Sequence, residues 1–124
     1  MPSNITVVKV RGVLMVTMPA DPDDSTIGEL QDKALESMEQ HGASALVLDI
    51  TAVDTVDSFF ARTISETAQM VGLMGGRTVV AGMQPAVAIT ATQLGLTFRL
   101  VETALSVDRA LDIVSEKGER GRAP

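Results

Sequence analysis

The stretch from Ala43 to Leu73 constrains the fold more than any other part of the chain, because its hydrophobic pattern changes period once. Residues 45–50 are apolar except for one aspartate, which is typical of a strand buried on both faces. A polar turn follows at 51–57, and apolar residues then recur at helical spacing, at Phe60, Ile64, Ala68 and Val71. The stretch therefore predicts a buried strand that leads through a short turn into an amphipathic helix.

Ser58 lies where one pattern gives way to the other, just after Asp54 and Asp57. In open α/β sheets ligands bind at the carboxyl ends of the strands, and the start of a helix offers unpaired N–H groups and the positive end of the dipole. A hydroxyl at this place is well positioned for phosphorylation, because the helix start favours the added negative charge. A simple N-cap role for Ser58 is the alternative.

The rest of the chain repeats the alternation of strand and helix. Strands are predicted at residues 5–10, 13–18, 45–50, 77–81 and 98–101. Helices are predicted at residues 26–41, 58–73, 85–94 and 106–115. This order predicts an α/β fold with a mixed sheet of about five strands, in which an N-terminal hairpin precedes parallel βαβ units, and with four helices.

Short signals predict where these elements begin and end. Arg11-Gly12 separates the first two strands and predicts a tight hairpin. Thr26 followed by Glu29 forms a capping-box pattern, so the first helix is predicted to begin at Thr26 and to end at His41 and Gly42.

One domain is expected at residues 1–115, followed by a charged, flexible tail at 116–124.

Composition excludes several classes of function. The 124 residues include three Phe, no Tyr and no Trp, and the net charge is −6, so a nucleic-acid surface is not expected. There is no cysteine, which excludes disulfides and a thiolate nucleophile. The sequence shows neither a signal peptide nor an apolar run long enough for a membrane span, and this predicts a cytoplasmic protein without membrane contact.

Catalytic and cofactor motifs are also missing. The only histidine, His41, falls at the far end of another predicted helix, so a serine hydrolase centred on Ser58 is not expected. Asp49, Asp54 and Asp57 are explained more simply as turn and cap residues than as metal ligands. A receiver-type aspartyl phosphate at Asp54 or Asp57 lacks the accompanying acidic pair and lysine. We expect neither catalysis nor a cofactor or metal, with a small-ligand site or enzyme at the strand ends as the alternative.

Three segments carry a resemblance to a known family: DTVDSF at 54–59, LMGGR at 73–77 and AGMQPAVAIT at 81–90. Together with the βαβ arrangement they resemble the STAS domain of bacterial anti-sigma factor antagonists, and within that family the RsbS-type scaffold proteins of the stressosome. The resemblance extends from Ile5 to Val114. Phe59 stands where the simpler antagonists usually carry glycine.

The resemblance implies a non-catalytic regulatory scaffold. Such proteins assemble with RsbR-type STAS paralogues into a multi-subunit stressosome that sequesters an RsbT-type switch kinase. Phosphorylation of the serine matching Ser58 releases the kinase to start a general stress response, and a dedicated phosphatase resets the system. Thr90 matches a second acceptor of the longer paralogues. A stand-alone anti-sigma factor antagonist, regulated by phosphorylation of the same serine, is the alternative.

The residues around Ser58 are expected to form the partner surface, which comprises Asp54, Thr55, Asp57 and Phe59. Phe59 is predicted to be partly exposed, because Phe60 has the better phase for burial with Ile64. The acidic loop at 21–24 is predicted to be solvated, with partner contact as the alternative. Three methionines are predicted to fill the core: Met70, Met74 and Met83.

Overall fold

The computed structural model describes residues 5–94 and 101–122 and confirms the α/β fold with five strands and four helices. The elements follow one another as β1 (Thr6–Val10), β2 (Val13–Thr17), α1 (Asp24–His41), β3 (Ala45–Asp49), α2 (Ser58–Leu73), β4 (Arg77–Ala81), α3 (Pro85–Gln93), β5 (Val101–Ala104) and α4 (Val107–Arg122). The sheet order is β1-β2-β3-β4-β5, so strands adjacent in the chain are adjacent in space. Among the described strands, β1 and β2 pair in antiparallel fashion, and the other three pairs are parallel.

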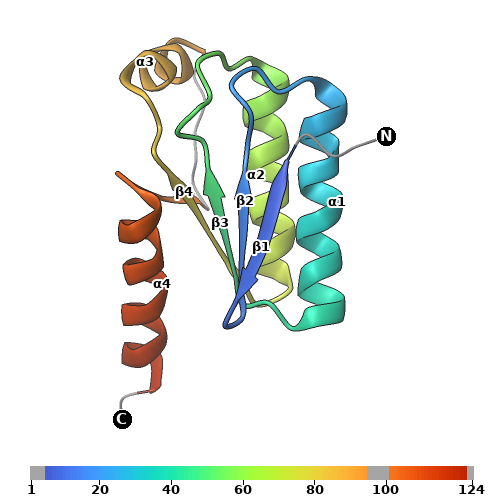
Figure 1. Ribbon diagram of the computed structural model, residues 1–124, viewed down its shortest axis with the longest axis vertical. Coiled ribbons are helices and arrows are strands. Elements are labelled where there is room, and N and C mark those ends of the chain that lie inside the picture. The colour runs from blue at the N-terminus through green and yellow to red at the C-terminus, as the bar shows by residue number, and fades with distance from the viewer. Residues whose placement is uncertain (1–4, 95–100, 123–124) are drawn as a thin grey trace.

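The helices cover the two faces of the sheet unequally (Figure 1). On one face α1 and α2 lie side by side over the larger core cluster, which includes Leu14, Leu30, Leu48 and Ile64. On the other face α4 packs on a smaller cluster around Val47 and Val79. None of the helices that the structure describes has the length and apolar character needed to cross a membrane.

The hairpin between β1 and β2 turns where the sequence predicted. Arg11 and Gly12 have φ angles of 48° and 80°, and a two-residue turn with two positive φ angles matches the twist of a hairpin. The backbone N–H of Ser44 donates to the Gly12 carbonyl over 2.7 Å. This bond ties the hairpin to the residue that precedes β3.

The start of α1 corrects the prediction that the helix begins at Thr26. The N-cap is Asp23, whose carboxylate accepts a hydrogen bond from the Thr26 N–H over 2.8 Å. Aspartate is at least as good a cap as threonine, and Thr26 instead lies buried in the first turn of α1. The other end agrees with the prediction, since Gly42 closes α1 with a φ of 63°.

The C-terminal elements also differ from the sequence-based boundaries. The described strand β5 begins at Val101, the last residue of the predicted strand 98–101, and residues 98–100 lie outside the described part. The strand was predicted at 98–101 because most of these residues are apolar. In the structure, the residues that pair with β4 are Val101 to Ala104. Helix α4 continues to Arg122, past residue 115, where the domain was predicted to end. The flexibility of 116–124 stays a prediction.

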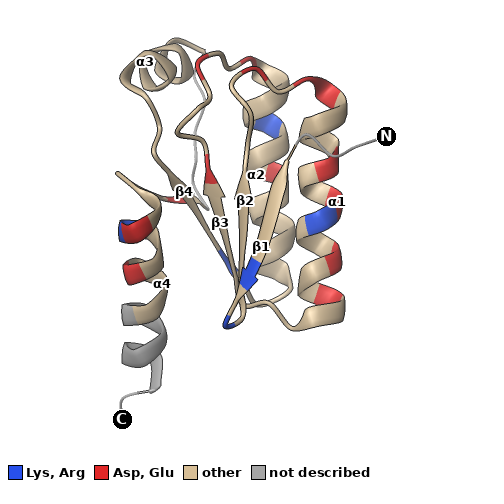
Figure 2. Ribbon diagram, in the orientation of Figure 1, with Lys and Arg blue, Asp and Glu red and all other residues tan. Residues whose placement is uncertain are grey.

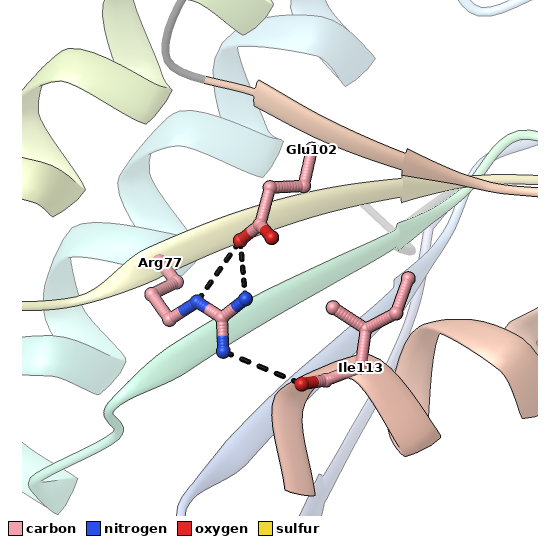
Figure 3. A network of polar contacts seen from close by, with 3 residues as sticks. All are labelled: Arg77, Glu102 and Ile113. Atoms are coloured by element: carbon pink, nitrogen blue, oxygen red, sulfur yellow. Dashed lines mark hydrogen bonds and ion pairs between the residues drawn. The ribbon is translucent and has the colours of Figure 1, made fainter. Parts of the chain in front are cut away.

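One half-exposed polar network joins three elements at the start of β4 (Figure 3). The Arg77 guanidinium donates through Nε to Oε2 of Glu102 on β5 over 2.9 Å and forms an ion pair with the same oxygen through Nη2. Its Nη1 donates to the Ile113 carbonyl of α4 over 3.5 Å. Arg77 therefore links β4 to its neighbouring strand β5 and to helix α4.

Two of the three methionines predicted to fill the core lie on the surface. Met74 is 46% exposed and Met70 is 36% exposed, whereas Met83 is partly buried against the larger core cluster. The prediction was wrong for Met70 and Met74, because both line a surface hollow shared with α1 and remain exposed there.

Candidate functional site at the start of helix α2

Ser58 is the first residue of α2, and its side chain is exposed. It follows the loop that leaves the carboxyl end of β3, at the edge of the sheet where α1 and α3 also begin (Figure 1). Parallel strands bring their carboxyl ends to the same edge, so the loops after β2, β3 and β4 meet there. The hydroxyl of Ser58 can therefore be reached from outside the protein.

The cap of α2 is Asp57, not Ser58. An oxygen of the Asp57 carboxylate accepts a hydrogen bond from the Phe60 N–H over 2.8 Å. The simple N-cap role considered for Ser58 is therefore wrong, and the predicted cap role of Asp57 is confirmed. Among the described residues, no hydrogen bond holds the Ser58 hydroxyl.

The β3–α2 loop, residues 50–57, is fastened to the loop before α1. The Asp54 N–H donates to the Ala20 carbonyl over 3.1 Å, and the Thr55 hydroxyl donates to the Asp21 carboxylate over 3.0 Å. Val53 in the same loop is fully buried. These contacts fix the backbone that presents Ser58 before any partner is bound.

The same loop is fastened on its other side to the start of α3. The Gln84 side-chain amide donates to the Thr51 carbonyl over 2.7 Å, and the Thr51 N–H donates to the Asp49 carboxylate over 2.9 Å. Gly82 has a φ of 79°, and a Cβ there would lie 2.1 Å from the Thr51 hydroxyl oxygen. Only glycine at position 82 lets these two loops approach so closely.

The adjacent residues Phe59 and Phe60 differ in burial, as the helical spacing predicted. Phe60 is 4% exposed and belongs to the core, whereas Phe59 is half-buried and packs against that core from its margin. A surface cavity of about 110 Å³ opens next to Phe60, with Asp21, Thr55 and Asp57 among its polar walls. Phe59 therefore offers an apolar contact beside an exposed hydroxyl.

The loops around Ser58 carry charge of one sign, and the next basic residue along the chain is Arg62, one turn into α2. The loops at 18–24 and 50–58 contain five aspartates and no lysine or arginine, and Figure 2 shows this acidic edge in red. The aspartates are Asp21, Asp23, Asp24, Asp54 and Asp57, and all five are exposed. Hydrogen bonds from the backbone and side chain of Thr26 hold the pKa of Asp23 below its ordinary value.

Thr90, the second candidate acceptor, lies apart from the Ser58 loop. It belongs to α3 and is half-buried, and its hydroxyl donates to the Ala86 carbonyl one helical turn earlier, over 3.1 Å. A hydroxyl held inside a helix in this way is less accessible than Ser58. Modification of Thr90 stays a prediction.

The aspartates near Ser58 accept hydrogen bonds from backbone N–H groups and from threonine hydroxyls. Asp49 accepts hydrogen bonds from Thr51, Asp57 caps α2, and the Asp54 carboxylate accepts from the Thr55 hydroxyl over 3.3 Å. Among the side chains that the structure describes, in residues 5–94 and 101–115, no three acidic or histidine groups come together as metal ligands. His41 ends α1 at the opposite end of the domain from Ser58.

The sequence did not reveal the attachments of the Ser58 loop. Gln84 was treated only as the residue before a helix-starting proline, and Asp21 only as a member of a solvated loop. Gly82 carried the clearest unused signal, because a glycine directly after a buried strand often marks a positive φ or a close approach of backbones.

Comparison with known proteins places the chain in a family. The model of the STAS domain family matches residues 4–110. Over 117 residues, 94% of this chain, it is 26% identical to the RsbT co-antagonist protein RsbRA of Bacillus subtilis (strain 168). The chain spans only 40% of the length of that relative.

Two solved structures match at higher coverage. The chain superposes on Moorella thermoacetica RsbS S58E with a TM-score of 0.82 and 30% identity, over 94% of this chain and 99% of that one. It also matches a chain from the molecular architecture of the stressosome, a signal integration and transduction hub, with a TM-score of 0.75 and 30% identity, over 91% and 98% of the two chains. Both matches cover almost the whole of their partner chain.

Proposed function

The chain belongs to the STAS domain family, and from this we propose that it is a non-catalytic scaffold whose partner binding is switched by phosphorylation of Ser58. In its unmodified form it joins a stressosome-type assembly with RsbR-type STAS paralogues and sequesters an RsbT-type switch kinase. Phosphorylation of Ser58 by that kinase releases it and so activates a general stress response. A phosphatase then removes the phosphate.

The observation that carries this proposal is the position of Ser58. The hydroxyl is exposed at the start of α2, while Asp57 takes over the capping role that would otherwise occupy a serine at a helix start. Phe59 and the acidic residues of the neighbouring loops surround it. A kinase can therefore reach the hydroxyl without unfolding any part of the domain.

Similarity to scaffold proteins supports the assembly part of the proposal. The match covers 99% of the RsbS chain and 94% of this one, so the likeness in fold extends over nearly all of both chains. The form of RsbS that was solved is named S58E, in which glutamate replaces a serine. A second matched chain comes from the stressosome itself.

The physical effect of the phosphate follows from the charges on this edge. A phosphoserine adds about 1.5 to 2 negative charges at neutral pH. The start of α2 stabilises that charge, so the fold tolerates it. A partner surface that fits the neutral hydroxyl and Phe59 then meets repulsion and loses its desolvated contact. The switch therefore changes binding more than structure.

The first experiment identifies the acceptor. The chain is incubated with the RsbT-type kinase and ATP, and the modified residue is mapped by mass spectrometry. We expect one phosphate on Ser58, stable to acid and hydroxylamine, and none in Ser58→Ala. Ser25→Ala is the matched control, because Ser25 is also exposed in the first turn of a helix on the same edge. A hydroxylamine-labile phosphate on Asp57 would instead support a receiver-type domain.

The second experiment tests retention of the kinase. In a pull-down at equal protein concentration, Ser58→Ala is expected to retain the kinase after ATP is added, whereas Ser58→Asp is expected to release it without ATP. Equal retention by the two variants would contradict the proposed switch. Size-exclusion chromatography with an RsbR-type paralogue then distinguishes a scaffold, which elutes in a very large complex, from a stand-alone antagonist.

A further inference from the structure

An apolar groove lies at the end of the domain opposite to Ser58. It runs between the C-terminal halves of α1 and α2 and has a cavity volume of about 520 Å³. Its walls are formed by Leu35, Glu36, Glu39, Met70, Leu73 and Met74. We call these six residues the α1–α2 groove.

The apolar side chains of the groove are unusually open to solvent. Leu73, the last residue of α2, is 83% exposed, and Met74 and Met70 are 46% and 36% exposed. Single exposed apolar residues are common on protein surfaces, whereas three that line one hollow form a contiguous apolar patch, a feature that marks interaction sites. Methionine is flexible and polarizable, which suits a surface that adapts to another side chain.

The charge around the groove indicates which partner it fits. Glu36 and Glu39 line it directly, and both are exposed. Helix α1 carries five acidic residues and a single lysine, and Figure 2 shows the acids along the exposed side of that helix. A segment with apolar side chains flanked by lysines or arginines would satisfy both features.

We propose that the α1–α2 groove docks a basic amphipathic helix of a partner protein. Apolar anchors at i, i+3 or i+4 would enter between Leu35 and Leu73, and lysines or arginines on either side would face Glu36 and Glu39. A second copy of this chain fits less well, because each copy has a net charge of −6 and would bring more negative charge to an acidic rim.

The groove is independent of the phosphorylation site. Ser58 begins α2 and Leu73 ends it, so 15 residue steps of helix separate them, about 22 Å at the usual rise. A partner bound at the groove leaves the Ser58 edge uncovered. The domain can therefore hold one protein at each end of α2, as a scaffold requires.

Binding of a model helix tests the proposal directly. The probe is a fluorescently labelled, amidated peptide of about 15 residues, built from leucine and lysine with helical spacing, and fluorescence anisotropy measures its affinity. We expect saturable binding, at least about tenfold weaker in Leu73→Ser, because one buried leucine contributes roughly that much. Leu105→Ser is the matched control, since Leu105 is 85% exposed and lies outside the groove.

Two further measurements test the contribution of charge to peptide binding and the position of the bound peptide. Glu36→Gln combined with Glu39→Gln is expected to weaken binding several-fold at low salt, and Asp108→Asn with Asp112→Asn on α4 is expected to leave it unchanged. A peptide with glutamate in place of every lysine is expected not to bind. Amide NMR shifts on addition of the basic peptide are expected at residues 35–39 and 70–74.

Three results would overturn the proposal. The first is equal affinity of Leu73→Ser and Leu105→Ser for the basic peptide. The second is a set of NMR shifts centred on the acidic loops near Ser58, which would show non-specific attraction. The third is concentration-dependent dimerisation that Leu73→Ser abolishes while the peptide fails to bind, which would assign the groove to a second copy. None of these results bears on the kinase experiment, because the Ser58 variants leave the groove intact.

Discussion

Phe59 and Phe60 are neighbours in the chain with different surroundings, and they allow a matched test of the core. Phe60 is 4% exposed, so Phe60→Ala is expected to lower the free energy of unfolding by about 3 to 5 kcal/mol. Phe59→Ala is expected to lower it by less than half as much, because that side chain is half-buried. Urea unfolding of the two variants measures the difference. Similar losses would show that Phe59 belongs to the core and is not available to a partner.

Asp23 predicts how stability depends on pH. Its pKa is lower in the folded chain than in the unfolded chain, because Thr26 donates hydrogen bonds to the carboxylate. The charged carboxylate therefore stabilises the fold above its unfolded pKa, and this contribution is lost as the pH falls below about 4 and through the folded pKa. The melting temperature of the wild type should exceed that of Asp23→Asn at neutral pH, and the difference should shrink in acid.

The control for this measurement lies in the same turn. Asp24→Asn removes a neighbouring carboxylate without removing the cap. If its pH dependence matched that of Asp23→Asn, the effect would come from the general charge of the helix start and not from the bond to Thr26.

At the scale of the elements, substitution by alanine is expected to have opposite effects on stability at Gly82 and at Gly28. Gly82→Ala places a Cβ against Thr51 at a positive φ, so we expect a loss of roughly 1 to 3 kcal/mol and a displaced β3–α2 loop. Gly28 lies inside α1, and no heavy atom from outside its own turns lies within 4 Å of the position that a methyl group would take there. Gly28→Ala is therefore expected to add about 0.5 to 1 kcal/mol. Thermal unfolding of both variants, with NMR shifts at residues 50–57, provides the measurement. A neutral Gly82→Ala would contradict the close approach of the two loops.

The strands and helices could largely be predicted from the sequence, because their signals are local. The change of period at Ser58 placed β3 and α2, and the pair Arg11-Gly12 placed the hairpin. The cap of α1 could not be decided in this way, because Asp23 and Thr26 are both good caps. Side-chain preference alone does not say which of them faces solvent.

The candidate site could be predicted only in part. Its centre follows from the order of strand, turn and helix, but its supports come from residues distant in the chain, as when Gln84 donates to Thr51. Helical spacing likewise places Met70 and Met74 at the end of α2 without saying that α1 leaves that side uncovered. Contacts between elements depend on how helices pack, and the pattern within one element does not carry that information.

For the molecule as a whole, the charge switch at Ser58 should leave the fold unchanged. The start of α2 favours the new charge while Asp54 and Asp57 oppose it, so Ser58→Asp is expected to change the free energy of unfolding by less than about 1 kcal/mol. Urea unfolding and far-UV circular dichroism of the variant measure this. A larger loss would mean that kinase release reflects unfolding of the domain, and not repulsion at an intact surface.

The order of the sheet has a consequence for synthesis. Because each strand pairs with the one before it in the chain, a strand leaving the ribosome meets an edge that is already formed. No early segment has to wait for a distant one to be made, and none has to be threaded between completed strands. The domain can therefore grow outward from its hairpin, one crossover at a time, while translation continues.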